Sequence, residues 1–244
     1  MIDTHAHLGE DAAEVLDRAR AAGVTRIVAV ATTVADAHGV LALADAEDGV
    51  YAALGIHPHE AGTAREADVD ELRALLSHPR VVAVGETGLD HFRDYAPRDA
   101  QRWLFEAQLG LAAEWGKPVV IHTRAADDDT LEMLRAHDGA VVLHCFSSPP
   151  LLAEASRRGW YVSFAGNVTY KNAYDLRSSA RAVASDRLLA ETDSPYLAPQ
   201  PVRGRRNEPA FVVHTYRALA EARGVELDAL VARVDANADA VFAL

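Results

Sequence analysis

The sequence contains very little cysteine and very little lysine. Cys145 is its single cysteine, so no internal disulfide can form, and we expect the reducing environment of the cytoplasm. Lys117 and Lys171 are its only lysines, and the other 22 of its 24 lysine and arginine residues are arginine. Lys117 precedes a predicted strand and Lys171 lies well past another. Neither is placed to become the carboxylated lysine that bridges two metal ions in many barrel enzymes.

Long apolar runs are also missing. No run approaches the roughly 20 residues needed to span a bilayer, and we expect no membrane association. The opening residues MIDTHAHLGED have neither a basic nor an apolar stretch, so we expect no secretory signal. The net charge of −12 argues against a tight, non-specific binder of nucleic acid, but it leaves room for a polyanionic substrate that metal ions and a local basic loop receive. One basic cluster, Arg203-Gly-Arg-Arg206, could bind phosphate locally. Ion pairs on the protein surface are the simpler interpretation of such a cluster.

Eight apolar, β-branched segments alternate with helical patterns along the chain. Strands buried on both faces have this composition, and strict alternation with helices is typical of parallel sheets. The sequence therefore predicts one domain over residues 1–244, a TIM (β/α)8 barrel. The predicted strands are Ile2–Thr4, Arg26–Ala31, Val50–Gly55, Val81–Gly85, Pro118–Ile121, Ala140–Leu143, Tyr161–Phe164 and Leu188–Glu191.

Histidines and acids recur where these predicted strands end. In a parallel barrel such residues meet on one rim. His5 and His7 are two residues apart on an extended chain, so they point to the same side and can bind one ion, with Asp193. His122 and His144 follow neighbouring strands and suit a second ion. Glu86 is the candidate carboxylate bridge between the two ions.

This donor set indicates hydrolytic chemistry. Four imidazoles with two carboxylates favour Zn²⁺ or Mn²⁺ over Mg²⁺, which prefers oxygen ligands. Two such cations activate water and stabilise a phosphoryl centre. We expect Asp193 and Glu86 to be catalytic, Asp193 by also accepting a proton from the attacking water. The competing acid Glu191 lies deeper by alternation and takes a supporting role.

With these residues in place, the chain resembles the TatD family of metal-dependent hydrolases and deoxyribonucleases. The resemblance runs nearly end to end, and its motifs are specific when taken in order. They are Asp3-Thr-His-Ala-His7, Gly55-Ile-His-Pro-His59, Gly85-Glu-Thr-Gly-Leu-Asp90, Val120-Ile-His-Thr-Arg124, His144-Cys-Phe-Ser147, Glu191-Thr-Asp-Ser-Pro-Tyr-Leu-Ala-Pro199 and Arg203-Gly-Arg-Arg-Asn-Glu-Pro209.

The resemblance implies a TIM barrel with two, sometimes three, divalent metals. It assigns His5, His7 and Asp193 to one ion, His122 and His144 to the other, and Glu86 between them. The activity it implies is metal-dependent DNA hydrolysis, often exonucleolytic, here expected to run 3′ to 5′. DNA is then a transient substrate, and no obligate protein partner is expected.

Three residues at the rim depart from the family pattern: Ala125, Ser148 and Gly9. None is a predicted ligand, but all three bear on substrate choice.

Substrate contacts are predicted at His57, Arg124 and Arg205. His57 follows the third strand and suits a substrate phosphate or an extra metal, while His59 equally suits stiffening of its loop. Arg124 suits a phosphate oxygen or an ion pair with the following helix. A metal-dependent amidase or esterase acting on a small molecule or an aminoacyl ester is the alternative function, and the acidic net charge favours it. A barrel that binds metal without catalysis is a third interpretation, which the complete ligand set disfavours.

Overall fold

Eight parallel strands follow one another in chain order, from β1 to β8, in a computed structural model that describes residues 1–244. The strands are β1 (Ile2–Ala6), β2 (Arg26–Val30), β3 (Val50–Leu54), β4 (Val81–Asp90), β5 (Val119–Arg124), β6 (Val141–Leu143), β7 (Tyr161–Phe164) and β8 (Leu188–Ala190). The helices are α1 (Ala12–Ala21), α2 (Val34–Ala46), α3 (Glu66–Leu75), α4 (Arg98–Trp115), α5 (Asp127–Leu134), α6 (Leu152–Arg158), α7 (Tyr174–Ala182), α8 (Val212–Arg223) and α9 (Leu227–Phe242).

The connectivity is that of the predicted TIM barrel. Helices separate consecutive strands, as right-handed parallel crossovers require. A parallel bridge between Ala6 and Ser194 also joins the end of β1 to the segment that follows β8. The fold prediction is therefore confirmed. None of the helices is long and apolar enough to cross a membrane.

The residues divide into two compact units. Unit 1 comprises Met1–Ala29 and His144–Leu244, and unit 2 comprises Val30–Leu143. The expectation of a single domain over residues 1–244 stays a prediction, and the two units are described separately below.

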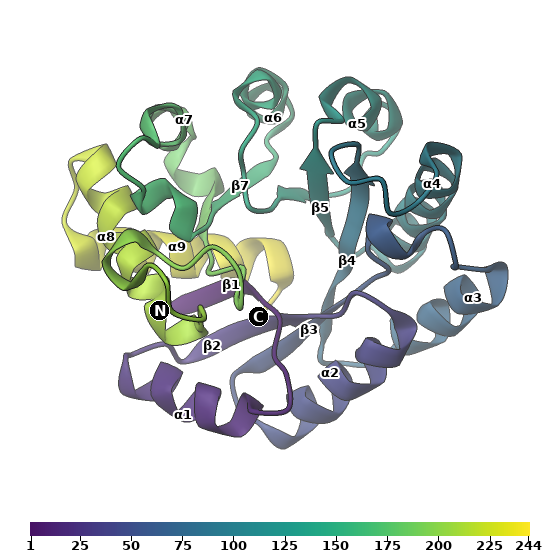
Figure 1. Cartoon of the computed structure of the whole chain (residues 1–244), viewed down its shortest axis with the longest axis horizontal. Helices are drawn as coiled ribbons and strands as arrows, with labels where there is room; N and C mark the ends of the chain where they lie inside the picture. Colours follow the sequence, from purple (N-terminus) through teal and green to yellow (C-terminus); the bar gives the residue numbers. More distant parts are fainter. The chain divides into compact units, whose positions relative to one another are not determined.

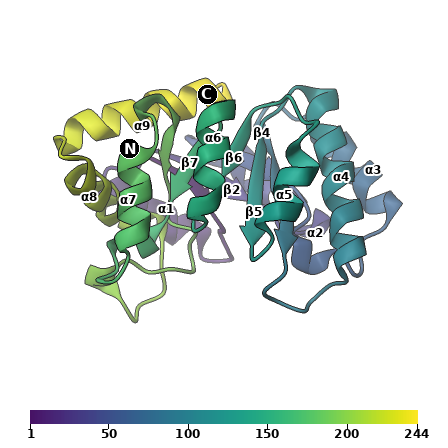
Figure 2. The same ribbon diagram turned by 90° about the horizontal axis from the view of Figure 1, so that it is seen from above.

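Unit 1 contains β1, β2, β7 and β8 with five helices, among which α8 packs beside α7 and α9 (Figure 2). Helix α8 is tied to β1 by Tyr216, which is fully buried and donates its hydroxyl to the carbonyl of Ile2 at 2.9 Å. The left-handed Gly224, with a φ of 66°, ends this helix, as glycine commonly does. These contacts hold the amino-terminal strand in place, and that strand carries His5 and leads directly into His7.

Unit 2 contains β3 to β6 with α2 to α5, and its longest helix, α4, lies along β4 (Figure 1). The buried face of α4 includes Leu104, Phe105 and Leu111, each at most 1% exposed. Two glutamines, Gln101 and Gln108, lie on the same buried face. A buried amide needs hydrogen-bond partners, so we expect these glutamines to form hydrogen bonds with neighbouring segments as well as packing in the core.

Three strands run further than their apolar residues predicted. β4 extends to Asp90 because its ladder with β5 continues through polar residues, pairing Gly88 with His122 and Asp90 with Arg124. β1 similarly extends to Ala6 and β5 to Arg124. The predicted strand ends were therefore wrong here, and His5, Glu86 and His122 lie within strands rather than just after them. Backbone hydrogen bonding, not side-chain hydropathy, decides where these strands stop.

Candidate metal centre

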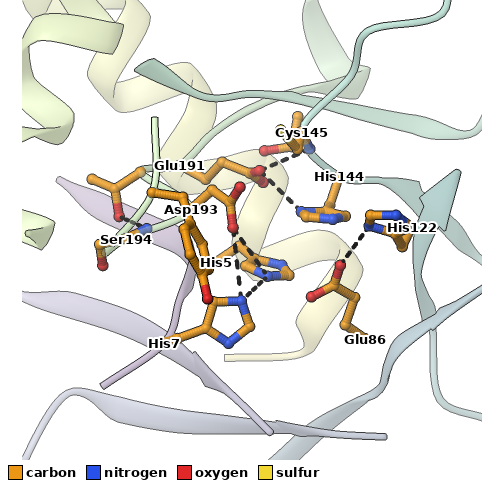
Figure 3. A network of polar contacts seen from close by, with 12 residues as sticks. His5, His7, Glu86, His122, His144, Cys145, Glu191, Asp193 and Ser194 are labelled. Carbon is orange, nitrogen blue, oxygen red and sulfur yellow. Dashed lines mark hydrogen bonds and ion pairs between the residues drawn. The ribbon is translucent and has the colours of Figure 1, made fainter. Parts of the chain in front are cut away.

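His5, His7 and Asp193 converge in unit 1 (Figure 3). The Nε2 atoms of the two histidines lie 3.3 Å apart. The Asp193 Oδ1 atom lies 3.7 Å from Nε2 of His7 and 4.0 Å from Nε2 of His5. Two imidazole nitrogens and a carboxylate oxygen directed at one point are a donor set that suits Zn²⁺ or Mn²⁺, so these residues fit a metal ion.

Backbone contacts bring Asp193 to the end of β1. The N–H of Asp193 donates to the carbonyl of His5 at 3.0 Å, and the N–H of His7 donates to the carbonyl of Ser194 at 2.8 Å. Asp193 has a φ of 53°, in the left-handed region that costs a non-glycine residue about 1–3 kcal/mol. The surrounding hydrogen bonds hold this strained backbone, which is a common arrangement at functional sites.

His144 follows β6 directly, as predicted, and lies beside His5. The two imidazole rings stack with centroids 4.0 Å apart. Nδ1 of His144 lies 3.2 Å from Oε1 of Glu191, which also accepts a hydrogen bond from the N–H of Cys145 at 2.7 Å (Figure 3). A carboxylate on Nδ1 fixes the ring orientation and makes Nε2 the ligand atom.

Glu191 is fully buried, yet it is suited to remain a carboxylate. Burial by itself raises its pKa, but the charge and hydrogen bond of His144, with His5 and Ser163, outweigh burial and hold the pKa below its usual value. The supporting role expected for Glu191 agrees with this contact. It orients His144, whereas Asp193 faces His5 and His7.

Unit 2 presents a second group of histidines and acids around His122. Its Nδ1 lies 2.9 Å from Oε1 of Glu86, and its Nε2 lies 3.0 Å from Oδ2 of Asp90. Figure 3 shows the contact with Glu86. Glu86 is only 3% exposed, so its carboxylate needs polar partners, and His122 supplies one.

His57 and His59 join the same group. With His122 they form a set of three potential metal ligands. Nε2 of His57 lies 3.3 Å from Oε1 of Glu86, and Nε2 of His59 lies 2.9 Å from Oδ2 of Asp90. Burial lowers the pKa of His57, which favours its neutral form. His59 therefore lies within the cluster and does more than stiffen its loop.

Asp90 links this cluster to the loop that follows β4. It is fully buried and accepts hydrogen bonds from the backbone N–H groups of Phe92 and Arg93, each at 2.9 Å. Burial raises its pKa, but the hydrogen bonds from His122, Arg93 and His59 outweigh burial and lower the pKa below its usual value. Asp90 is thus an ionised carboxylate that connects His59 and His122 with the loop after β4.

The two buried glutamines of α4 hold the strand ends that carry these side chains. Gln101 accepts from the N–H of Asp90 at 2.9 Å and donates to its carbonyl at 3.1 Å. Gln108 accepts from the N–H of Ile56 at 2.8 Å and donates to the hydroxyl of Thr87 at 2.7 Å. Sequence reasoning missed both, although two glutamines seven residues apart on an otherwise apolar helix face were a usable signal.

The predicted substrate arginines lie in different units. Arg124 ends β5 in unit 2, and its guanidinium lies 3.9 Å from the centroid of the Phe92 ring. Arg205, in unit 1, lies over the ring of Phe211 and lines a pocket of about 290 Å³ that also contains His7 and Ser194.

The other two arginines of that pocket are paired with acids. Arg18 lies 2.8 Å from Glu208, and Arg206 lies 2.6 Å from Asp11. Arg205 alone among them has no carboxylate partner, so its charge is available to an anion that enters beside His7.

Comparison with known proteins places the chain among similar hydrolases. The model of a family described as TatD related DNase matches residues 2–243. The chain is 36% identical to an uncharacterized metal-dependent hydrolase, YabD, of Bacillus subtilis (strain 168), covering 99% of this chain and 98% of that protein. It is 36% identical to the 3′-5′ ssDNA/RNA exonuclease TatD of Cronobacter sakazakii, covering 98% of this chain and 94% of that one.

Solved structures give the same result. The crystal structure of YjjV, a TatD homologue from Escherichia coli K12, is 31% identical and covers 100% of this chain and 98% of its own, with a TM-score of 0.94. The strand order, the His and acid groups and the family match across residues 2–243 lead to one conclusion: the chain belongs to the TatD-related DNase family.

Proposed function

We propose that this TatD-family hydrolase cleaves phosphodiester bonds of DNA with the help of divalent metal ions, acting as a 3′-to-5′ exonuclease. The observation that carries the proposal is the convergence of His5, His7 and Asp193 on one point, with the unpaired Arg205 in the adjoining pocket. The exonuclease activity named for the Cronobacter sakazakii relative supports the polarity. Cys145, the lone cysteine, supports a cytoplasmic location.

The proposed ligand assignment uses two divalent ions. His5, His7 and Asp193 would hold one, His122 and His144 would hold the other, and Glu86 would be the carboxylate shared by both. Orientation of His144 by Glu191 supports its role, because histidine ligands usually donate their second ring N–H to an acceptor. Imidazole-rich donors favour Zn²⁺ or Mn²⁺, and Mg²⁺ is the less favoured ion.

When bound, the ions would lower the pKa of water to about 7 and would neutralise phosphate charge. Asp193 is proposed to take the proton of the attacking water, since its carboxylate faces both histidines of the same group. Glu86 and Glu191 keep His122 and His144 in orientation. The hydrogen bonds around Asp193 hold its backbone, so its carboxylate needs little reorganisation during the reaction.

His57 is proposed to donate a hydrogen bond to a substrate phosphate. Its Nδ1 accepts the backbone N–H of His59 at 3.1 Å, which leaves the proton on Nε2. Nε2–H points toward Oε1 of Glu86 at 3.3 Å, so it is already directed at an anionic oxygen. A neutral ring with this tautomer serves a phosphate oxygen better than it serves a metal ion.

Arg205 and Arg124 are proposed to contact the substrate as cations. Arg205 is placed for a phosphate that enters the pocket beside His7. Arg124 brings a positive charge to the carboxyl end of β5, two residues after His122. Arginine is well suited to phosphate because its planar fork donates in pairs.

The deciding experiment is hydrolysis of DNA oligonucleotides labelled at the 3′ or 5′ end by metal-stripped protein, with Mn²⁺, Zn²⁺ or Mg²⁺ added back. We expect cleavage from the 3′ end with Mn²⁺ or Zn²⁺. Asp193→Asn should lower the rate about 100- to 10,000-fold, the usual effect of losing a general base. Glu86→Ala should lower both rate and metal content.

Glu154→Gln is the matched control, since Glu154 forms an ion pair with Arg157 on α6. It should cleave like the unmodified protein. Metal binding without cleavage of any oligonucleotide would contradict the nuclease proposal and favour the amidase or esterase alternative.

A further inference from the structure

Two large aromatic side chains are left exposed in the loop after β4. Phe92 is 60% exposed and Tyr95 is 62% exposed. Burying an aromatic ring stabilises a folded protein, so a loop that exposes two rings within four residues forgoes that stabilisation. Exposed apolar side chains that lie close together are a feature of many interaction sites. Neither ring is among the predicted metal ligands or substrate contacts.

Two arginines cover these rings. The guanidinium carbon of Arg124 lies 3.9 Å from the centroid of Phe92, and that of Arg93 lies 5.6 Å from Phe92 and 5.9 Å from Tyr95. Neither arginine has a carboxylate partner, whereas Arg102 nearby is paired with two acids. On a chain with a net charge of −12, two unpaired cations beside exposed rings form a local site for an anion that also has flat apolar faces.

The loop that carries the rings is fixed beside the histidine cluster of unit 2. Asp90 accepts the N–H groups of Phe92 and Arg93, each at 2.9 Å, and the N–H of His91 donates to the carbonyl of Arg124 at 2.8 Å. The other carboxylate oxygen of Asp90 faces His59 and His122.

Ring contacts extend the same connection. The ring of Tyr95 meets that of His59 edge to face, with centroids 4.7 Å apart. The aromatic and cationic groups are therefore held directly beside residues of the candidate metal centre, without having to be ordered by a ligand.

We propose that Phe92 and Tyr95, with Arg93 and Arg124, form a stacking platform for unpaired bases of single-stranded nucleic acid. The inference rests on the proposed nuclease function and names the part of the chain that recognises the strand. Aromatic faces and arginines stack bases of any sequence, each contributing about 1–3 kcal/mol, while the cations follow the phosphates. Bases in a duplex are stacked on each other, so the platform selects single strands.

The test measures binding to Mn²⁺-loaded protein by the fluorescence anisotropy of a labelled oligothymidylate, with phosphorothioate linkages to slow cleavage. Phe92→Ala and Tyr95→Ala should each raise Kd about 5- to 100-fold. Phe92→Trp should bind like the unmodified protein, because it keeps a ring for stacking. Both alanine variants should keep the unmodified metal content.

Trp115→Ala is the matched control. Trp115 is 39% exposed at the carboxyl end of α4, and the chain runs from it into the amino end of β5, the end opposite Arg124. This variant should leave Kd unchanged. A second arm uses strands with abasic residues at the 3′ end. If bases stack on Phe92, the unmodified protein binds the abasic strand more weakly than the intact strand. The Phe92→Ala variant, which already lacks the ring, should then bind the abasic strand almost as well as it binds the intact strand.

The outcomes separate the two proposals. Equal Kd values for Phe92→Ala, Tyr95→Ala and Trp115→Ala, with cleavage of DNA intact, would overturn the platform and leave the nuclease proposal standing. Additive losses from base removal and from Phe92→Ala would also overturn it. A protein that binds two metal ions but neither binds nor cleaves any strand would overturn both.

Discussion

At the scale of single residues, Asp3 is the buried carboxyl that joins β1 to the segment after β8. It is fully buried, and it accepts the N–H of Thr192 at 2.9 Å and contacts the Thr192 hydroxyl at 2.6 Å. Burial raises its pKa to about 8, and the hydrogen bonds from Thr192 only partly offset burial. Asp3 is therefore protonated at neutral pH in the folded protein, two residues before His5.

This pKa predicts a pH-dependent stability. Below about pH 4 the carboxyl is protonated in the folded and unfolded chain alike, and its contribution is complete. As pH rises toward 8, the unfolded chain ionises first, so unfolding releases a proton and the free energy of unfolding falls by up to about 1.4 kcal/mol per pH unit. Asp3→Asn should remove that part of the slope.

Urea unfolding in EDTA between pH 5 and 8 measures the effect. The control is Asp17→Asn, on the exposed face of α1, which should keep the slope of the unmodified protein. An Asp3→Asn variant with an unchanged slope would show that Asp3 is ionised in the folded state.

At the scale of elements, β4 approaches β5 so closely that only glycine fits at position 88. A Cβ atom there would lie 2.0 Å from the carbonyl oxygen of His122, and the φ of 134° already excludes most other residues. Gly88 thus keeps His122 in register next to Glu86.

Gly88→Ala should shift β4 against β5, lower the metal content and reduce the free energy of unfolding by about 1–3 kcal/mol. Gly110→Ala is the matched control on α4, since a Cβ atom added there would have no other atom within 4 Å apart from its own stretch of helix. It should raise the free energy of unfolding by about 0.5–1 kcal/mol, because alanine favours helix. Urea unfolding and metal analysis check both, and a Gly88→Ala protein with full metal content would contradict the expectation.

The elements also show how far the sequence alone could lead. The apolar runs predicted all eight strands and the alternation with helices, because strands buried on both faces carry a continuous hydrophobic signal. The polar extension of β4 to Asp90 carries no such signal. It depends on pairing with β5, a contact between residues far apart in the chain.

The same division holds for the site. The convergence of His5, His7 and Asp193 could be predicted because their residue types and their positions at strand ends are visible in the sequence. The hydrogen bonds of Gln101 and Gln108 and the cation–π contact at Phe92 could not be predicted. The residue type of a glutamine or an aromatic ring does not indicate its partners, which depend on how the chain packs.

At the scale of the whole molecule, the net charge of −12 makes salt a test of substrate class. Phosphodiester binding releases counterions, and for single strands the slope of log K against log salt is about −0.7 for each phosphate neutralised. Oligonucleotide binding should therefore weaken steeply with salt, and Arg205→Ala should make the slope shallower by about 0.7.

Arg73→Ala is the control, since Arg73 is paired with Asp70 and Glu114 on the surface of unit 2. It should leave the slope unchanged. The slope of log K against log salt is measured by binding titrations at about 50 to 200 mM salt, where binding to phosphates changes strongly with salt. Turnover that ignores salt would favour a neutral small-molecule ester or amide.

The division of unit 1 between Met1–Ala29 and His144–Leu244 has a consequence for how the protein is made. Ribosomes add about 5–20 residues per second, and the nascent chain emerges amino end first. His57, Glu86 and His122 belong to one continuous stretch, so all three are available as soon as that stretch has emerged. His5 and His7 emerge first of all, yet they must wait for Asp193, so the first of the proposed metal ligands to be synthesised belong to the group that is completed last.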